Sequence, residues 1–364
     1  MNRKTPTAEM GMACRSRQIF LSIPTRWSLL PPQTCGDDQQ LAHDIVCRAV
    51  QESIGQLACY PDPFCRELTG AIAQWEGAAQ ENLLCGNGAA ELIHSYCQAL
   101  RPRRAMELAP TFCEYTASLE AVGCTVVRYP LSPDRGFALE EDVLSFLEQQ
   151  APDVLFLCHP NNPTGRLVDP VLRERIVEQC RRQGTRLFVD ECFLDLSDQG
   201  REASFQSYLL DWPGLFLLKA FTKSYAMAGL RLGYGISADR ALLAQMSRMV
   251  QAWNVSLPAQ KAGEAALGEN AYLAEARKLI VQERAYLERA LREYLGARIC
   301  PSQANYMLFY CDRPLYEALL EQGILIRRCA NYPGLGQGWY RIAVKRPEEN
   351  RLLVAALRRI AEEE

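Results

Sequence analysis

The sequence has few histidines, no excess of basic charge and no long apolar run. Its 364 residues include three histidines, and 40 lysines and arginines stand against 43 aspartates and glutamates. Three histidines without a paired C-x-x-C motif do not make a usual zinc ligand set, so no metal site is expected. The formal net charge of −3 does not favour nucleic acid as a partner. No apolar stretch approaches the roughly 18 residues of a membrane span, so no membrane partner is expected either.

The 15 cysteines do not form a recognisable disulfide framework. Their number is odd, and they are scattered along a long chain without paired spacing. Secreted disulfide scaffolds are usually short and dense in cysteine. We therefore expect these cysteines to be small buried side chains in a reducing cytoplasm. The first residues are basic but lack an apolar core followed by a cleavage site, and a signal peptide is not expected.

What the sequence does contain, from about residue 80, is an alternation of short apolar runs and amphipathic stretches. This alternation is typical of an α/β domain with a mainly parallel sheet, in which ligands bind beyond the carboxyl ends of the strands. Strands are predicted at 82–85, 105–108, 125–129, 154–158, 186–189, 215–218 and 231–236, and helices at 89–100, 170–183 and 240–250.

The last quarter of the chain predicts a smaller α+β domain. A long charged amphipathic helix is expected first, because its apolar residues recur on one side. The predicted elements are that helix at 271–294, strands at 304–310, 324–327 and 339–344, and a final helix at 348–362. The expected organisation is an N-terminal arm over 1–50, a large α/β domain over 51–270, and the linking helix with the small domain over 271–364.

The most informative segment runs from Phe216 to Tyr234 and contains Lys223 and Arg231. An apolar, strand-like stretch leads Lys223 into a turn, and Arg231 follows eight residues later. A lysine that must form a Schiff base needs a desolvated, partly cationic setting. An arginine can supply that positive field while it binds a phosphate. The segment resembles the lysine motif of the fold-type I enzymes that use pyridoxal 5′-phosphate (PLP), in the aminotransferase class I/II group.

Two loops ahead of this segment suit the same cofactor. The glycine turn at residues 86–91 follows a strand and opens a helix, so the backbone N–H groups of Gly88, Ala89 and Ala90 can hold a phosphate. Phe112 follows the next predicted strand and can stack on a flat heteroaromatic ring.

Two polar residues follow later strands. Asn162 lies in the rigid string Asn-Asn-Pro-Thr-Gly, where its amide can donate a hydrogen bond to a ring oxygen. Asp190 ends a strand, where its carboxylate can pair with a pyridine N–H and keep the ring protonated as an electron sink.

The order of these motifs is that of fold-type I enzymes. The resemblance implies the fold-type I architecture, PLP as cofactor and a homodimer, in which Tyr60 reaches the cofactor phosphate across the interface. A closer resemblance, from about residue 55 to the end, is to the threonine-phosphate decarboxylases of cobalamin synthesis. It rests on strings such as Tyr-Pro-Asp-Pro from Tyr60, and Tyr-Arg-Ile-Ala-Val at 340–344.

This closer resemblance implies a substrate and a reaction. Arg341 matches the residue that holds the amino-acid carboxylate, and Arg327 matches the arginine aimed at the substrate phosphate. The two can hold the carboxylate perpendicular to the ring, so that CO₂ departs rather than the α-proton. The implied reaction converts L-threonine O-3-phosphate to (R)-1-aminopropan-2-yl phosphate, with Lys223 or a water returning the proton.

Alternative functions stay open. An aminotransferase of the histidinol-phosphate type would need a 2-oxo acid, and a PLP-fold protein that only binds its ligand is a third interpretation. Ala220 replaces a hydroxyl residue that commonly binds the cofactor phosphate, although Thr222 or Ser224 can compensate. Phe193 stands where many aminotransferases have a tyrosine. The decarboxylase resembles this chain in having phenylalanine there, which favours decarboxylation over amino-group transfer.

The N-terminus departs from the decarboxylase pattern, because residues 1–45 lack its His-Gly-Gly-Asn opening and its Asn-Pro-Leu-Gly loop. Codons allowed for residues 19–32, read two bases later, would produce a string that contains Asn-Pro-Leu. A frameshift and a divergent arm are therefore two open interpretations, and the DNA sequence of this region distinguishes them.

Overall fold

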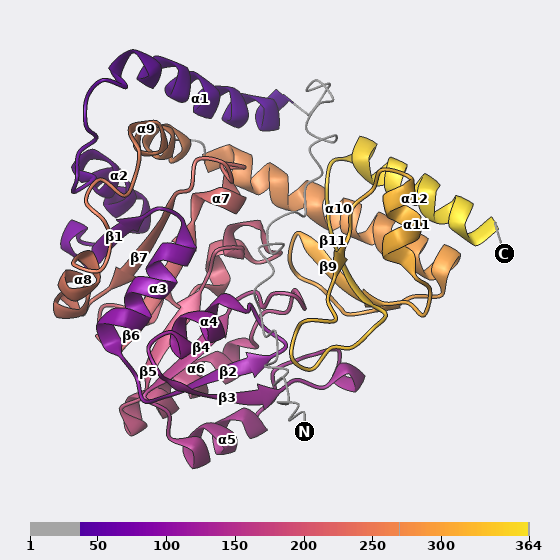
Figure 1. The fold of residues 1–364 in the computed structure, drawn as a ribbon, viewed down its shortest axis with the longest axis horizontal. Coiled ribbons are helices and arrows are strands. Elements are labelled where there is room, and N and C mark those ends of the chain that lie inside the picture. The colour runs from indigo at the N-terminus through magenta and orange to yellow at the C-terminus, as the bar shows by residue number, and fades with distance from the viewer. Residues whose placement is uncertain (1–36, 269, 363–364) are drawn as a thin grey trace, which may run out of the picture.

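The computed structural model describes residues 37–268 and 270–362 and arranges them around two sheets (Figure 1). The larger sheet has the strand order β1-β7-β6-β5-β4-β2-β3. Strand β7 runs antiparallel to both β1 and β6, and the other pairs are parallel. The prediction of a mainly parallel sheet is confirmed. Its strands are β1 (Leu83–Gly86), β2 (Arg104–Ala109), β3 (Thr125–Pro130), β4 (Val154–Cys158), β5 (Arg186–Asp190), β6 (Leu215–Ala220) and β7 (Gly233–Ser237).

Helices cover both faces of this sheet because its central strands are apolar on both sides. Phe156 of β4 packs on one face against helices α3 (Ala89–Leu100), α4 (Glu114–Glu120) and α8 (Arg240–Ser247). Its neighbours Leu155 and Leu157 pack on the other face, with α2 (Arg66–Glu76), α5 (Asp142–Gln150), α6 (Pro170–Gln183) and α9 (Leu257–Ala266). We call these sides the α3 face and the α2 face.

The smaller sheet is antiparallel, in the order β10-β11-β9-β8. Its strands are β8 (Arg298–Ile299), β9 (Tyr306–Tyr310), β10 (Arg327–Arg328) and β11 (Trp339–Ala343). The long helix α10 (Asn270–Leu295) and helices α11 (Leu315–Glu321) and α12 (Pro347–Glu362) pack on it. The predicted strand at 324–327 is wrong over most of its length. Ile324 and Ile326 are buried in the core of this unit, so their apolar pattern reflects packing rather than strand pairing.

Local signals explain why some helices end where the sequence predicts. Asp169 accepts hydrogen bonds from the backbone N–H groups of Val171 and Leu172 at the start of α6, and Gly184 ends that helix with φ of 70°. An aspartate cap and a left-handed glycine are the usual signals for these two positions.

The other helices are α1 (Asp37–Ser53), the one-turn α7 (Phe221–Ser224), and short 3₁₀ turns η1 (Ile54–Gln56), η2 (Gln80–Asn82), η3 (Pro133–Arg135), η4 (Leu194–Leu196), η5 (Gly200–Ala203) and η6 (Gln206–Tyr208).

Most of the expected N-terminal arm, including the segment that raises the question of a frameshift, lies outside the described residues. Among the described helices, none is both long and apolar enough to cross a membrane. In the same part of the chain, no cluster of three or more histidine, cysteine or acidic side chains is arranged to hold a metal ion.

Candidate active site

Lys223 lies just beyond the carboxyl end of β6, on the one-turn helix α7 rather than in an open turn. Its side chain lines a cavity of about 310 Å³ between the large sheet and the small one, which we call the Lys223 cavity. The side chain opens into the cavity, yet the protein packed around it lowers the pKa of its amine, and the charges of Arg341 and Arg231 lower that pKa further. A lysine in this setting has more neutral amine available for nucleophilic attack than an ordinary surface lysine.

The glycine turn after β1 leads directly into α3. Gly88 has a φ of 80°, a conformation that favours glycine, and its N–H donates to the carbonyl of Gly86 at 2.8 Å. The tight turn uses this N–H in the structure, and its binding to a phosphate stays a prediction. Ala89 and Ala90 begin the helix, where first-turn N–H groups have no intrahelical acceptor and favour an anion.

Arg231 faces this turn. A Cβ atom built on Gly88 would lie 2.5 Å from Nη2 of Arg231, so only a glycine leaves room for the guanidinium there. Arg231 has φ of 59°, in the left-handed region that costs a non-glycine residue about 1–2 kcal/mol. A guanidinium beside a helix N-terminus is a suitable donor set for a phosphate monoester, and the residues present fit the phosphate of PLP.

Asp190 provides a buried carboxylate at the end of β5. Its side chain accepts hydrogen bonds from the hydroxyl of Tyr115 at 2.5 Å and from the backbone N–H of Cys192 at 2.9 Å. Burial raises the pKa of the Asp190 carboxyl, while the bonds from Cys192 and Tyr115 oppose that rise. Both bonds hold the carboxylate in one orientation at the carboxyl edge of the sheet, where it can pair with a protonated pyridine nitrogen.

Asn162 and Arg341 come together although they lie 179 positions apart. Arg341 donates a hydrogen bond from Nη1 to the side-chain oxygen of Asn162, and its guanidinium lies 5.3 Å from the ring of Tyr306. The neighbouring Asn161 holds the loop in place, since its Nδ2 donates to the carbonyl of Pro110 at 3.0 Å. With its oxygen bound to Arg341, Asn162 presents its NH₂ group as the donor for a cofactor oxygen.

Arg327 joins this group through strand pairing. It lies opposite Arg341 in the β10–β11 register, and both side chains line the Lys223 cavity. Nη2 of Arg327 donates to the side-chain oxygen of Asn331 at 3.3 Å, a long bond. The structure therefore brings two guanidinium groups and the Lys223 amine to one cavity, which is suited to an anionic ligand.

The remaining candidates differ in how close they lie to this cavity. Thr222 is buried and lines it. Phe112 is half-buried, with its ring edge-on to Tyr115 at 5.6 Å. Tyr60 is 81% exposed, and its ring lies tilted against that of Trp253 with the centroids 4.7 Å apart. It is not among the residues that line the cavity of a single chain.

Two residues at the site were not selected from the sequence. Tyr115 lies three residues after Phe112, and helical spacing would have indicated that the two rings share a side. Tyr306, which lies under Arg341 and donates to the carbonyl of Asn161 at 3.0 Å, had no such signal, because its role depends on how the two sheets meet.

Comparison with known proteins identifies the relatives of this chain. Residues 33–357 match the family model for aminotransferases of class I and II. The threonine-phosphate decarboxylase of Salmonella typhimurium is 37% identical over 318 residues, which cover 86% of each chain. A histidinol-phosphate aminotransferase of Desulfitobacterium hafniense is 32% identical over 306 residues, covering 82% of each chain. The crystal structure of histidinol-phosphate aminotransferase from Clostridium acetobutylicum has a TM-score of 0.81 at 26% identity, covering 88% of this chain and 96% of that one.

Proposed function

Since the chain belongs to the PLP-dependent class I and II aminotransferase family, we propose that it is a decarboxylase within that family. Its substrate is L-threonine O-3-phosphate, and its products are CO₂ and (R)-1-aminopropan-2-yl phosphate, a building block of cobalamin. The relative from Salmonella typhimurium, named for this reaction and 37% identical, supports the substrate class.

The observation that carries this proposal is the position of Arg327 and Arg341. They lie opposite each other on the paired strands β10 and β11, and both line the Lys223 cavity. The substrate has two anionic groups, a carboxylate and a dianionic phosphate. Guanidinium groups bind both kinds of anion through paired N–H donors. Arg341 is anchored by Asn162 and receives the carboxylate, while the less constrained Arg327 receives the phosphate.

Each further residue has a defined task in this site. PLP, when bound, supplies a protonated ring that withdraws electrons from a bond to the substrate α-carbon. Asp190 keeps that ring protonated, held in place by Tyr115. Arg341 would hold the substrate carboxylate in a fixed orientation, which favours loss of CO₂ over loss of the α-proton. Lys223, in its protonated form, would then supply the proton that replaces CO₂ on the α-carbon.

Phe193 supports decarboxylation over amino-group transfer. Its ring lies 5.5 Å from the Lys223 amine and edge-on to Tyr306 at 4.9 Å, in the position where many aminotransferases have a tyrosine. The second candidate is nevertheless an aminotransferase of the histidinol-phosphate type, which the Desulfitobacterium hafniense relative supports.

The working unit in this proposal is a homodimer. Tyr60, Trp253, Phe64 and Leu57 are large apolar side chains that are exposed in the single chain. Burial of such a patch against a second copy would remove it from water and place Tyr60 at the partner's cofactor phosphate. The mass of the protein in solution, measured by light scattering, tests this part directly.

The reaction is tested by incubating PLP-loaded protein with O-phospho-L-threonine in the absence of any 2-oxo acid. Catalytic release of CO₂ and aminopropanol phosphate is the expected result. Activity that appears only with histidinol phosphate and 2-oxoglutarate would replace the decarboxylase with the aminotransferase. Absence of both activities would contradict both candidates.

A further inference from the structure

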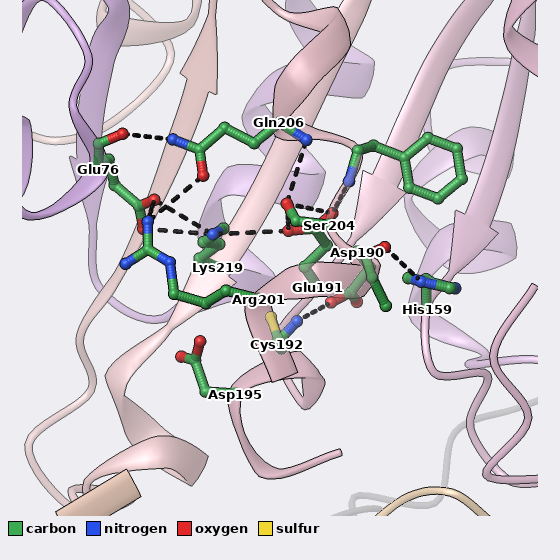
Figure 2. A network of polar contacts seen from close by, with 12 residues as sticks. Glu76, His159, Asp190, Glu191, Cys192, Asp195, Arg201, Ser204, Gln206 and Lys219 are labelled. Atoms are coloured by element: carbon green, nitrogen blue, oxygen red, sulfur yellow. Dashed lines mark hydrogen bonds and ion pairs between the residues drawn. The ribbon is translucent and has the colours of Figure 1, made fainter. Parts of the chain in front are cut away.

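A buried ion network lies behind the site, on the α2 face of the large sheet (Figure 2). The ammonium of Lys219 lies 3.2 Å from Oε1 of Glu76 and 3.5 Å from Oε2 of Glu191. Lys219, Glu76 and Glu191 are 3%, 5% and 2% exposed, respectively. Charges so deeply buried are costly unless they are paired and hydrogen-bonded, so this arrangement depends on each member being in place.

The remaining acceptors of both carboxylates are also occupied. Glu191 accepts bonds from the Ser204 hydroxyl at 2.8 and 3.0 Å and from the Phe205 backbone N–H at 2.7 Å. Glu76 accepts from the Tyr234 hydroxyl and forms an ion pair with Arg201. The network therefore joins the end of α2, the ends of β5 and β6, strand β7 and the loop at 200–206.

The network is continuous with the site through neighbouring backbone. Glu191 directly follows Asp190, and Lys219 precedes Lys223 by four residues. The backbone N–H of Glu191 donates to the carbonyl of Leu218 at 2.8 Å, which ties the end of β5 to β6. Successive strand side chains point to opposite faces. Asp190 therefore meets Tyr115 on the α3 face while Glu191 meets Lys219 on the α2 face. The two residues share one stretch of backbone, so a displacement of that backbone on the Glu191 side would also displace Asp190.

We propose that Lys219 is a positioning residue for the cofactor. By holding Glu191 and Glu76 on the α2 face, it fixes the backbone that carries Asp190 and the path of the chain from β6 into Lys223. The mechanism above does not use Lys219, and the side chain of Lys219 does not line the Lys223 cavity. This inference rests on the proposed use of PLP and concerns how tightly and in what orientation that group is held.

The test compares Lys219→Met and Lys219→Arg with a matched control. Arg284→Met removes another buried cation, which pairs with Asp198 at 2.7 Å, does not line the Lys223 cavity and forms no hydrogen bond or ion pair with the ion network of Lys219. Three quantities are measured for each variant: the Kd for PLP, the visible circular dichroism per bound PLP, and the Tm. Circular dichroism reports the orientation of the bound group, which a general loss of stability would not change.

We expect Lys219→Met to weaken PLP binding about tenfold or more, the size of effect seen when a partner that orients a ligand-binding group is lost. Its visible circular dichroism should change, and Lys219→Arg should restore both. Arg284→Met should lower the Tm while leaving PLP affinity within about twofold, because its partners Asp198 and Ala304 are not shared with Lys219, Glu191 or Asp190.

Equal losses of PLP affinity in Lys219→Met and Arg284→Met would overturn the positioning role. So would a lowered Tm in Lys219→Met with unchanged affinity and circular dichroism. If Lys219→Met does not fold, Glu191→Gln, which keeps the side-chain shape, replaces it in the same comparison. Failure of the wild-type protein to bind PLP would overturn the cofactor assignment itself, which separates the two outcomes.

Discussion

Two lysines at the end of β6, four residues apart, lie in opposite electrostatic environments. Lys219 is buried on the α2 face; burial lowers its pKa, but the carboxylates of Glu191 and Glu76 raise it more, and the net pKa is raised. Lys223 opens into its cavity on the other side. Burial by surrounding protein and the charge of Arg341 lower its pKa.

The comparison shows that the charged neighbours of a lysine decide its role more than the extent of its burial does. Neighbouring carboxylates keep Lys219 charged and bound in one place, as a structural cation requires. Lys223 has cationic neighbours and an open cavity, so its neutral amine is accessible as a nucleophile. The surplus of positive charge at the cavity is suited to an anionic cofactor and substrate, whereas the ion network balances its own charges.

The largest expected effect comes from removing the reactive lysine. Lys223→Ala should remove the visible absorbance of PLP linked covalently to the lysine and lower decarboxylation by on the order of 10³-fold or more, since a nucleophile and proton donor is lost. Lys219 cannot replace it, because its side chain does not line the cavity and is held by two carboxylates. An absorption spectrum and a CO₂ assay check this, and unaltered absorbance would contradict the role of Lys223.

A smaller loss is expected from Asp190→Asn. A neutral amide cannot balance a protonated pyridine nitrogen, so kcat should fall by about 10²–10³-fold, the range seen when one preorganised electrostatic partner is removed. Tyr115→Phe serves as the graded control, since it removes one bond to Asp190 while leaving the carboxylate, and it should have the smaller effect. Steady-state kinetics on both variants test the order, and an equal or reversed effect would contradict it.

Arg327→Gln should act on substrate binding. Losing one charge-assisted bond of about 1.5–3 kcal/mol should raise the KM for O-phosphothreonine roughly 10–100-fold. Arg328→Gln is the matched control, because the next residue is exposed and pairs with Glu317 at 2.7 Å away from the cavity. Similar KM values for the two variants would show that Arg327 does not bind the phosphate.

The smallest expected effect is a shift in the pH dependence of PLP capture when Arg341 is replaced. The charge of Arg341 lowers the pKa of Lys223, so Arg341→Gln should raise that pKa. The neutral amine then forms only at higher pH, and the midpoint for PLP capture by the apoprotein should move upward. Rates of capture measured across pH test this prediction, with Arg328→Gln expected to leave the midpoint unchanged. A downward or absent shift would contradict it.

The pattern of apolar runs was sufficient to predict most of the strands of the large sheet. Strand β4 (Val154–Cys158) and helix α6 (Pro170–Gln183) have the same bounds in the structure as in the prediction. These elements have strong local signals, such as a continuous apolar run or a capped and glycine-terminated helix. The predicted strand at 324–327 failed because apolar side chains at 324 and 326 are buried by packing in the core of the small unit. An alternating apolar pattern cannot distinguish a residue buried in a paired strand from one buried against neighbouring helices.

The sequence by itself determined the family and the order of the motifs, and it predicted Lys223 as the lysine that binds the cofactor, because short motifs depend on local turns and on strand ends. Only the tertiary structure decided which groups meet. It joined Asn162 to Arg341 and Tyr115 to Asp190, and it used the N–H of Gly88 within its own turn. It also placed the side chain of Lys219 in the buried ion network and that of Lys223 in the cavity. Side-chain partners far apart in the chain are chosen by how sheets and helices pack, and no local pattern encodes that choice.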